Sequence, residues 1–380
     1  MLDPKLIDSQ LSIEEYKRYS RHLVLDEVGK TGQSRLKFSK VLIVGLGGLG
    51  SLASMYLASA GIGQIGIVEY DTVSLSNLQR QILYDTRLVN KKKSLVGKAR
   101  LQYLNPHCRI IVFDTKLSAQ NASAIVTDYD VIVDASDNFL TRYLLNDIAV
   151  LFNIPVVYGA ILRKEGQISV FNYRGGPIFR DLFHENLQHN TALSCSEGGV
   201  FGGVVAVISS LQVNEVVKII LGLGNVTSGN LLVYDFSRSI FKTVSLKKKL
   251  VYSRKEAAKS LEGLNADEEA RYNLMKYNSK NKEVHPSEIM SHVNNKSCLV
   301  IDVRTKQEYE IVHLTDAQNV PLKLLLAQPF LDFVRSKIAK DFYLLIYCSA
   351  DSRSITATNM LSQLQIDSMR LSGGLKALGF

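Results

Sequence analysis

Short apolar runs alternate with longer stretches of helical pattern through the first half of the chain. The apolar runs predict four strands: Val41–Val44, Ile65–Tyr70, Arg109–Phe113 and Val131–Asp134. The helical stretches lie between and after them: Leu52–Ala60, Lys93–Leu104, Ala119–Asp128 and Asn138–Phe152. Strands that alternate with helices imply right-handed crossovers and a largely parallel sheet. The pattern therefore predicts a doubly wound α/β fold.

The pattern changes in the next part of the chain. Val156–Tyr158 continues the sheet, whereas Gln167–Tyr173 alternates apolar and polar positions, as antiparallel strands do. A terminal pair of strands is expected at Leu231–Phe236 and Phe241–Leu246. Together these runs predict a mostly parallel, Rossmann-like sheet with an antiparallel extension, which would help to form a platform for a protein substrate.

Two segments separate these strands. Tyr173–Val200 has little periodicity, and long loops inside compact domains are usually functional. Phe201–Leu223 is the most apolar long stretch of the chain, but Asn214, Glu215 and Lys218 interrupt it. We therefore expect it to be a buried core helix and not a membrane span.

The C-terminal part predicts a second, smaller α/β domain. Strand-like runs occur at Cys298–Arg304, Ala317–Val320 and Leu344–Tyr347, and a helix is expected to open at Ile355. The charge-rich stretch before them predicts a linker with a partly helical middle at Glu256–Met275. The expected organisation is one domain over residues 1–250, a linker over 251–283 and a second domain over 284–380.

Composition narrows the class of protein. The chain has 380 residues, of which 46% are hydrophobic, enough to bury two cores. Its four cysteines are scattered and none forms Cys-x-x-Cys, which favours a reducing compartment and gives no zinc-site spacing. The N-terminus shows neither an export nor a transit pattern, so a cytoplasmic location is expected, with the plastid stroma as the alternative for an organelle-encoded protein.

The net charge of +9 could indicate binding to nucleic acid. However, the basic residues fall in short runs, such as Lys91–Lys93 and Lys247–Lys249, without interleaved aromatic residues. A solvated basic face is the simpler interpretation, and attraction of an acidic protein partner or of ATP is the next. We expect no direct contact with nucleic acid.

A glycine-rich turn follows the first strand. Gly45, Gly47 and Gly50 form G-x-G-x-x-G at the start of a helix, where backbone N–H groups and the helix dipole favour a phosphate. Glu69 ends the next strand, where an acidic side chain can hydrogen-bond ribose hydroxyls. These residues predict a nucleotide site.

Charged residues beyond Glu69 narrow the type of nucleotide. Arg80 and Lys93 suit a triphosphate, whereas a nicotinamide dehydrogenase needs no such cations beyond the pyrophosphate. Asp137 follows the strand Val131–Asp134, at the sheet edge where ligands of open α/β sheets bind. A carboxylate beside phosphates is a natural Mg²⁺ ligand.

Several motifs resemble the MoeB/ThiF family of ubiquitin-activating-like enzymes. The similar segments are GLGGLG, the run Asp71–Gln81, Lys93, SDN at 136–138 and EGQISVF at 165–171. The resemblance implies ATP and Mg²⁺ as cofactors and adenylation of the C-terminal glycine of a small ubiquitin-like sulfur carrier protein that ends in Gly-Gly. It also implies further nucleotide-contacting residues: Ser76, Asn77, Leu78, Gln79 and Asn138.

The same resemblance implies a homodimer and a sulfur donor. Arg21 would reach across the dimer interface to the phosphates of the partner's ATP, although a surface salt bridge is the alternative. Cys195 lies where related enzymes carry a cysteine implicated in a thioester or persulfide step, and a packed thiol is the alternative. A cysteine desulfurase is the expected sulfur donor.

The chain departs from its relatives in two places. Many relatives hold a structural zinc with two Cys-x-x-Cys pairs, but here Ile178 and Asp181 occupy the positions of the first pair, and the stretch VYSRKE directly after Leu250 contains no cysteine, so we predict no zinc. Glu69 also replaces the usual aspartate, which is expected to affect ATP affinity more than chemistry.

The C-terminal domain resembles a single rhodanese sulfurtransferase domain. The resemblance rests on DVR at 302–304, Glu308-Tyr309, and a cysteine followed by C-x-x-x-x-R spacing at Cys348 and Arg353. Cys348, between a strand and a helix, would carry a persulfide anion stabilised by backbone N–H groups. Asp351 opposes ionisation if it points inward, so a catalytically silent docking module is the alternative.

Three functions are open at this point. The first is carrier adenylation with sulfur transfer, for molybdopterin synthase foremost, with tRNA thiolation or thiamine synthesis as alternatives. The second is a nicotinamide-dependent oxidoreductase. The third is a non-catalytic scaffold that binds a carrier protein.

Overall fold

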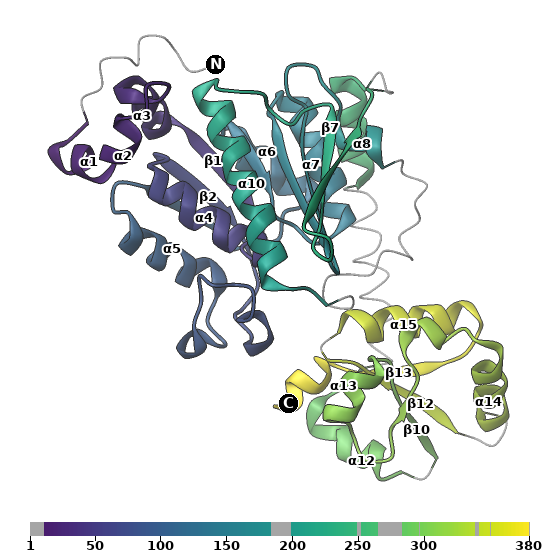
Figure 1. The fold of residues 1–380 in the computed structure, drawn as a ribbon. Helices are drawn as coiled ribbons and strands as arrows, with labels where there is room; N and C mark the ends of the chain where they lie inside the picture. Colours follow the sequence, from purple (N-terminus) through teal and green to yellow (C-terminus); the bar gives the residue numbers. More distant parts are fainter. Residues whose placement is uncertain are drawn as a thin grey trace. The chain divides into compact units, whose positions relative to one another are not determined.

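The computed structural model describes residues 11–183, 199–248, 252–264, 283–295, 297–338, 342–349 and 351–379. The chain divides into two compact units, Met1–Asp267 and Glu268–Phe380 (Figure 1). Each unit contains its own sheet and its own hydrophobic core. The two are therefore described one after the other.

The first unit is built on an eight-stranded sheet with the order β3-β2-β1-β4-β5-β6-β7-β8. The first five strands run parallel, and β6, β7 and β8 add antiparallel neighbours at one side. The strands are β1 Lys40–Val44, β2 Gln64–Val68, β3 Arg109–Phe113, β4 Val131–Asp134, β5 Val156–Leu162, β6 Glu165–Phe171, β7 Asn230–Asp235 and β8 Ile240–Ser245. The predicted mostly parallel sheet with an antiparallel extension is confirmed.

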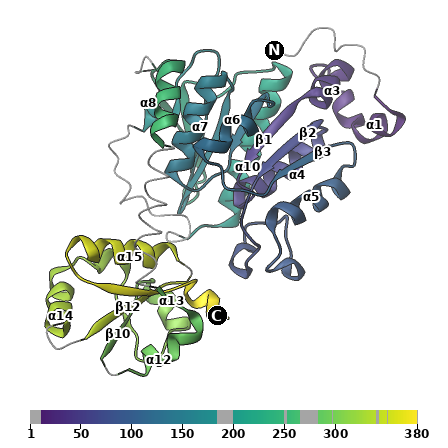
Figure 2. The same ribbon diagram turned by 180° about the vertical axis from the view of Figure 1, so that it is seen from behind.

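Helices cover both faces of this sheet. Figure 1 shows α4, α5 and α10 in front of it, and Figure 2, from behind, shows α6 and α7 on the opposite face. Along β1, Val41 and Ile43 join the core under the first layer, whereas Leu42 and Val44 join the core under the second. This alternation follows from the two-residue repeat of a strand. The helices are α1 Ile13–Arg18, α2 Ser20–Leu23, α3 Gly29–Phe38, α4 Gly48–Ala60, α5 Lys93–Leu104, α6 Ala119–Val126, α7 Phe139–Phe152, α8 Phe179–Leu182 and α10 Gly202–Leu221.

The long apolar helix α10 is a core helix, as expected. By length and composition alone it could cross a membrane. However, it packs against α4, β5 and β6, and its residues Val204, Ile208 and Val216 are fully buried. Because α10 is covered by these neighbouring elements, it can be apolar on most of its sides.

The N-terminal segment forms two short helices. A Ser12–Glu15 capping box begins α1, and α1 is divided from α2 at Tyr19. The Tyr19 side chain is buried, and its hydroxyl accepts a hydrogen bond from Asn105 Nδ2 at 2.8 Å. This anchor accounts for the break, because it fixes Tyr19 against the core from outside the helix.

The stretch 252–264 packs onto the first unit, although its sequence suggested a linker. Its helix, residues 254–264, buries Ala257 and Leu261 in the cores beside α7. The C-terminal part of the helix expected at Glu256–Met275 lies outside the described residues.

The second unit contains a five-stranded parallel sheet with the order β11-β10-β12-β13-β9. Its strands are β9 Glu283–Val284, β10 Cys298–Asp302, β11 Gln318–Asn319, β12 Tyr343–Tyr347 and β13 Ser368–Leu371. Its helices are α12 Ile289–Val293, α13 Lys306–Ile311, α14 Gln328–Ile338 and α15 Ser352–Gln363, with a short 3₁₀ helix at Gly374–Leu378. Helices α14 and α15 pack on one face of this sheet, and α12 with the C-terminal turn packs on the other.

Candidate functional site

The glycine-rich turn joins β1 to the first turn of α4. Gly45 has a φ of +91°, and a Cβ at this position would lie 2.8 Å from the carbonyl oxygen of Ala135. Gly47 is the N-cap residue of α4 and lines a cavity of about 340 Å³ above the carboxyl ends of the parallel strands. The N-terminus of a 13-residue helix therefore opens onto this cavity, which suits an anionic group.

Gly50 has a different role from the one expected. A Cβ there would lie 1.9 Å from the carbonyl oxygen of Gly45, so this glycine permits the helix to pack against the turn. Within the part of the chain that the structure describes, the residues that line the cavity do not include Gly50. The expectation that Gly50 allows a ligand to approach the backbone is thus replaced by a packing requirement.

Glu69 is buried beneath the turn and accepts backbone hydrogen bonds. One carboxylate oxygen accepts the N–H of Leu46 at 2.8 Å. The other accepts the N–H groups of Tyr70 and Asp71 at 2.8 and 2.9 Å. Glu69 lines the cavity, but its carboxylate is occupied by these backbone hydrogen bonds, which connect the end of β2 to the glycine-rich turn.

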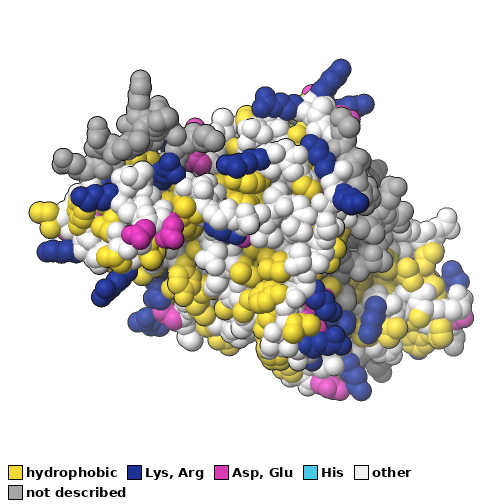
Figure 3. All heavy atoms as spheres, turned by 45° about the horizontal axis from the view of Figure 1, so that its top comes forward, with side chains coloured by type: hydrophobic (Ala, Val, Ile, Leu, Met, Phe, Trp, Pro, Cys, Tyr) yellow, Lys and Arg dark blue, Asp and Glu magenta, His cyan; other side chains and the backbone are white. Residues whose placement is uncertain are grey.

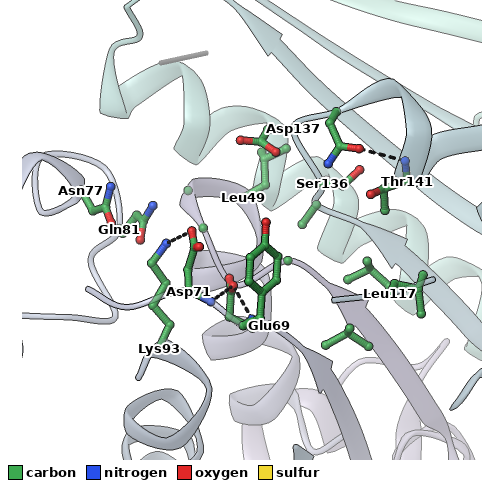
Figure 4. A pocket seen from close by; sticks show the side chains of 18 of the residues that line it. Leu49, Glu69, Asp71, Asn77, Gln81, Lys93, Leu117, Ser136, Asp137 and Thr141 are labelled. Atoms are coloured by element: carbon green, nitrogen blue, oxygen red, sulfur yellow. Dashed lines mark hydrogen bonds and ion pairs between the residues drawn. The ribbon is translucent and has the colours of Figure 1, made fainter. Parts of the chain in front are cut away.

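Charged side chains from three separate segments line the cavity, and Figure 4 labels two of them, Lys93 and Asp137. Arg80 follows the 3₁₀ helix Leu75–Asn77, Lys93 is the first residue of α5, and Asp137 follows β4. Asn77 and Asn138 line the same cavity, and the Asn138 side chain caps α7 by accepting the N–H of Thr141 at 2.9 Å. The structure thus brings together the charged residues that were predicted to surround a triphosphate.

Lys93 is almost fully buried, with 4% of its surface exposed. Its ammonium group lies 3.2 Å from the carboxylate of Asp71, whose side chain is largely exposed. A buried lysine needs a counter-charge, and Asp71 supplies it here. Figure 4 shows this pair pointing into the cavity.

A second buried ion pair, Asp134–Arg142, lies beside the turn between β4 and α7 that carries Asp137, here called the Asp137 turn. Asp134 Oδ1 accepts hydrogen bonds from the backbone and hydroxyl of Ser136 at 3.0 and 2.6 Å. Arg142 Nε lies 3.7 Å from Asp134 Oδ2, and Arg142 Nη2 donates to the carbonyl of Ser136 at 3.0 Å. Burial raises the pKa of Asp134, and the positive charge of Arg142 opposes that rise. This network fixes the turn that presents Asp137.

Three further predicted nucleotide-contacting residues do not line the cavity, among the described residues: Ser76, Leu78 and Gln79. The carbonyl of Ser76 accepts a hydrogen bond from Arg80 Nη1 at 3.1 Å, and Leu78 packs against the core under α4. These residues therefore support Arg80 and its loop. Arg21 is exposed on α2 and also lies outside the cavity of its own chain. Cys195 lies outside the described residues.

The prediction did not include four polar residues that line the cavity or support it: Gln81, Asp134, Thr141 and Arg142. Asp134 was visible as the polar end of a strand. Arg142 and Thr141 were visible as polar residues in the first turn of the helix after Asn138, which is the turn nearest a strand-end site.

The positions that bear zinc ligands in relatives do not fit a metal here. Ile178 is buried in an apolar cluster with Val150 and Ala257, and Asp181 accepts the N–H of Ile178 at 2.9 Å. Within the described residues, no group of three or more His, Cys, Asp or Glu side chains is placed to hold a metal ion.

A hydrogen-bonded cluster, here called the Asp147 cluster, lies beside these positions. The carboxylate of Asp147 is fully buried and accepts from Arg180 Nε at 2.7 Å and Arg180 Nη2 at 2.6 Å. It also accepts the hydroxyls of Tyr252 and Ser260 at 2.9 and 2.8 Å. The cluster thereby joins α7, α8 and the stretch 252–264.

In the second unit, Cys348 lies at the carboxyl end of β12, before α15. It is 1% exposed, and its Sγ lies 3.5 Å from Ser354 Oγ. Arg353 does not flank this cysteine as an unpaired cation, because both of its Nη groups contact Glu308 at 2.7 Å. Burial raises the pKa of Glu308, but the hydrogen bonds and positive charge of Arg353, together with the hydrogen bonds from Thr305, outweigh burial and lower the pKa to about 2.

The residues of the cavity fit Mg·ATP. A helix N-terminus, Arg80 and Lys93 provide positive potential for phosphates, and Asp137 is an exposed carboxylate at their side. Mg²⁺ is commonly bound by one or two carboxylates together with substrate phosphates. Asp137 would hold the ion, with Asn138 beside it.

Comparison with known proteins finds family matches over most of the chain. Residues 19–254 match the ThiF family, and residues 285–379 match the rhodanese-like domain. A probable molybdopterin-synthase adenylyltransferase of Porphyra purpurea is 40% identical, over 96% of this chain and 93% of the relative. A probable adenylyltransferase/sulfurtransferase MoeZ of Mycobacterium tuberculosis is 36% identical, over 98% of this chain and 96% of the relative.

A solved structure shares the fold of the first unit. The crystal structure of Escherichia coli MccB with MccA-N7isoASN aligns with a TM-score of 0.55 at 22% identity, covering 62% of this chain and 73% of that one. The sequence matches extend over both units and agree with the two sheets described above. The chain therefore belongs to the ThiF family and carries a rhodanese-like domain after its ThiF-family domain.

Proposed function

We propose that this protein adenylates the C-terminal glycine carboxylate of a small sulfur carrier protein and then helps to convert it to a thiocarboxylate, in molybdenum cofactor biosynthesis. The observation that carries the proposal is the gathering of Arg80, Lys93 and Asp137 around the glycine turn. The family membership and the names of the relatives agree with this chemistry.

The adenylation step requires the site to position a weak nucleophile and to neutralise phosphate charge. The carrier's carboxylate attacks the α-phosphate of ATP, a phosphorus–oxygen bond forms, and pyrophosphate leaves with the electrons of the broken bond. A carboxylate is a weak nucleophile, so positioning and charge neutralisation supply most of the acceleration. Arg80 and Lys93 would neutralise the β- and γ-phosphates, and Glu69 would hold the turn and the ribose side of the site.

Magnesium would add charge neutralisation to the same phosphates. Asp137 is the proposed protein ligand, because it is exposed at the end of β4 while Asp134 below it is buried and paired. The Asp134–Arg142 pair would keep the Asp137 turn in place when a charged ligand enters. Asp137 would thus bind the ion, and Asp134 would hold the turn that carries Asp137.

An apolar surface beside the cavity suits the carrier protein. Val200 lines the cavity, and the adjacent Phe201 stacks on Phe236 with ring centroids 5.1 Å apart. Tyr234 and Phe241 form a second aromatic pair on β7 and β8, and Phe241 is 49% exposed. Exposed apolar patches of this kind mark protein-binding sites. A carrier bound here could extend its C-terminal tail into the cavity.

Sulfur transfer would use the second unit. The terminal sulfur of a Cys348 persulfide would attack the carrier's acyl-adenylate, so that a carbon–sulfur bond forms and AMP leaves. A second thiol would then attack the Cys348 sulfur of this acyl disulfide, so that the S–S bond breaks, the thiocarboxylate leaves and a new disulfide remains on Cys348. A cysteine desulfurase is the proposed source of that sulfur. Cys195 is the proposed partner in the exchange, as a thioester or a persulfide.

A homodimer would complete the phosphate site. Arg21 is exposed on α2, next to an open cavity of about 640 Å³ between α2, α3 and α10. Its lining includes Leu25, which is 49% exposed, and Tyr56, which is 55% exposed. Figure 3 shows hydrophobic side chains gathered across the middle of the face that carries α10. We propose that a second copy covers this surface and receives Arg21 at its cavity.

Pyrophosphate exchange tests the proposal directly. Exchange of labelled pyrophosphate into ATP should require a carrier that ends in Gly-Gly, and should collapse in Asp137→Ala and Arg80→Ala. Cys348→Ala should retain exchange but lose sulfur transfer from thiosulfate to cyanide. Arg100→Ala, at an exposed position on α5, is the matched control.

Other outcomes would support the alternatives. Tight binding of NAD without any exchange would indicate an oxidoreductase. A carrier complex that forms equally well with and without ATP, again without exchange, would indicate a scaffold. Loss of exchange in Cys348→Ala would contradict the proposed division of labour between the two units.

A further inference from the structure

The loop between Cys348 and Arg353 contains an acid, Asp351. A carboxylate without a counter-charge at this place would disfavour a thiolate on Cys348 and would repel anionic sulfur donors. In the structure, however, Asp351 Oδ1 accepts a hydrogen bond from Arg370 Nη1 at 2.5 Å. It also accepts the backbone N–H of Gly373 at 3.0 Å. The acid thus faces β13 and the turn that follows it.

That turn is tied to the Cys348 loop at two further points. The N–H of Leu375 donates to the carbonyl of Cys348, and the N–H of Lys376 donates to the carbonyl of Ser349, each at 3.0 Å. Gly373 has a φ of +72°, and a Cβ there would lie 2.7 Å from Ala377. Glycine is therefore required for the chain to turn back under the loop.

The other flank of the loop carries a matching ion pair. Arg353 contacts Glu308 through both Nη groups, and Ser349 Oγ lies 3.2 Å from the same carboxylate. Arg370 in turn also pairs with Glu283 of β9. The loop is therefore held between two carboxylate–guanidinium pairs, one contributed by α13 and one by β13.

We propose that Arg370 is a positioning residue for sulfur transfer: it neutralises Asp351 and holds the Cys348 loop on the Gly373 turn. This inference rests on the proposed role of Cys348 as the sulfur carrier. In the thiosulfate reaction, the Cys348 thiolate attacks the outer sulfur of thiosulfate, a new S–S bond forms, and sulfite leaves with the electrons of the old one. Cyanide then takes the terminal sulfur as thiocyanate and restores the thiolate. Each of these anions enters the loop that contains Asp351.

The electrostatic part can be measured without sulfur transfer. The rate at which Cys348 reacts with iodoacetate, which is anionic, is divided by the rate with neutral iodoacetamide, both followed on the Cys348 peptide by mass spectrometry. In Arg370→Met this ratio should fall about tenfold or more, because both Asp351 and Glu283 lose their counter-charge. Adding Asp351→Asn should restore most of the ratio. Arg335→Met, an exposed arginine on α14, is the matched control and should change nothing.

Sulfur transfer provides the second measurement. In Arg370→Met, KM for thiosulfate should rise more than kcat falls, and the double variant should recover; Arg370→Lys should stay near the wild type. Asp351→Asn alone keeps an acceptor for Gly373 and should raise the iodoacetate ratio, which keeps the proposal testable if Arg370→Met does not fold.

Failure of the positioning role and failure of the sulfurtransferase function would give different results. Equal ratios in Arg370→Met and in the double variant would overturn the positioning role, because the effect would not pass through Asp351. A wild-type protein that shows the expected reagent ratios but transfers no sulfur would instead overturn the proposed sulfurtransferase function.

Discussion

The ammonium group of Lys93 lies 3.2 Å from the carboxylate of Asp71, at the edge of the nucleotide cavity. The lysine is buried, whereas the aspartate side chain is more than half exposed to solvent. A triphosphate that enters the cavity can therefore replace Asp71 as the ionic partner of Lys93, while the Asp71 carboxylate remains hydrated. The pair keeps a buried cation in place and ready for an anionic ligand.

Lys93→Met should reduce pyrophosphate exchange by about a hundredfold or more, the usual cost of removing one donor that stabilises charge in the transition state. Lys92→Met is the matched control, because Lys92 is adjacent in sequence but half-exposed and paired with Asp114 at 3.5 Å. Its exchange rate should change less than about threefold, as for a surface pair. Equal losses in the two variants would contradict a specific role for Lys93.

The sequence predicted most of the sheet because the signals for strands are local. The strands over Arg109–Phe113 and Val131–Asp134 are observed as predicted. By contrast, α3 was not predicted, since the residues it buries include Gly32, Gln33 and Ser34 and not an apolar stripe. Its burial depends on contacts with α10 that lie far away in sequence.

The charged residues of the site could be predicted from motif spacing, but their supports could not. Arg80, Lys93 and Asp137 stand near turns and strand ends, where polar residues are exposed to ligands. A buried arginine such as Arg142 is recognisable only when its partner Asp134 and the aromatic rings of Phe139 and Tyr158 are placed around it. Tertiary packing, which no local pattern encodes, decides such positions.

Arg142→Met should make stability fall as the pH rises. Burial raises the pKa of Asp134 in the folded state, and Arg142 is the charge that opposes this rise. Without Arg142, the folded protein holds the Asp134 proton more tightly than the unfolded chain does. Stability is then highest below the unfolded pKa, and is lost as the pH rises toward the folded one.

Thermal melts between pH 5 and pH 8 test this expectation. The Tm of Arg142→Met should decrease across this range relative to the wild type, and adding Asp134→Asn should remove the difference. The wild-type difference between the two pH values provides the baseline. A pH-independent loss of Tm in Arg142→Met would show that the arginine acts through packing alone.

The Asp147 cluster should stabilise the first unit without a metal. Removing one partner of a buried ion pair costs about 3–5 kcal/mol, so Asp147→Asn should lower the Tm strongly. Tyr252→Phe removes one hydrogen bond, worth about 1 kcal/mol, and should lower the Tm by about 2–4 °C for a unit of this size. Tyr103→Phe, at an exposed position on α5, is the control.

Metal analysis completes this test. Purified protein should contain far less than one zinc per chain, and a chelator should leave the Tm of the wild type unchanged. Stoichiometric zinc, or a chelator effect as large as that of Tyr252→Phe, would contradict the assignment of this support to the Asp147 cluster.

Mixing two inactive variants tests whether Arg21 acts across a dimer. In a mixed dimer of Arg21→Ala and Asp137→Ala chains, one cavity has its own Asp137 and receives an intact Arg21, whereas the other cavity has lost both. Half of randomly mixed dimers are of this kind and each has one working site of two, so about a quarter of the wild-type exchange should return. A mixture of Arg80→Ala with Asp137→Ala is the control: both residues line the cavity of their own chain, so every cavity keeps one defect and no exchange should return. Full activity of Arg21→Ala by itself, or the absence of recovery in the first mixture, would remove Arg21 from the phosphate site.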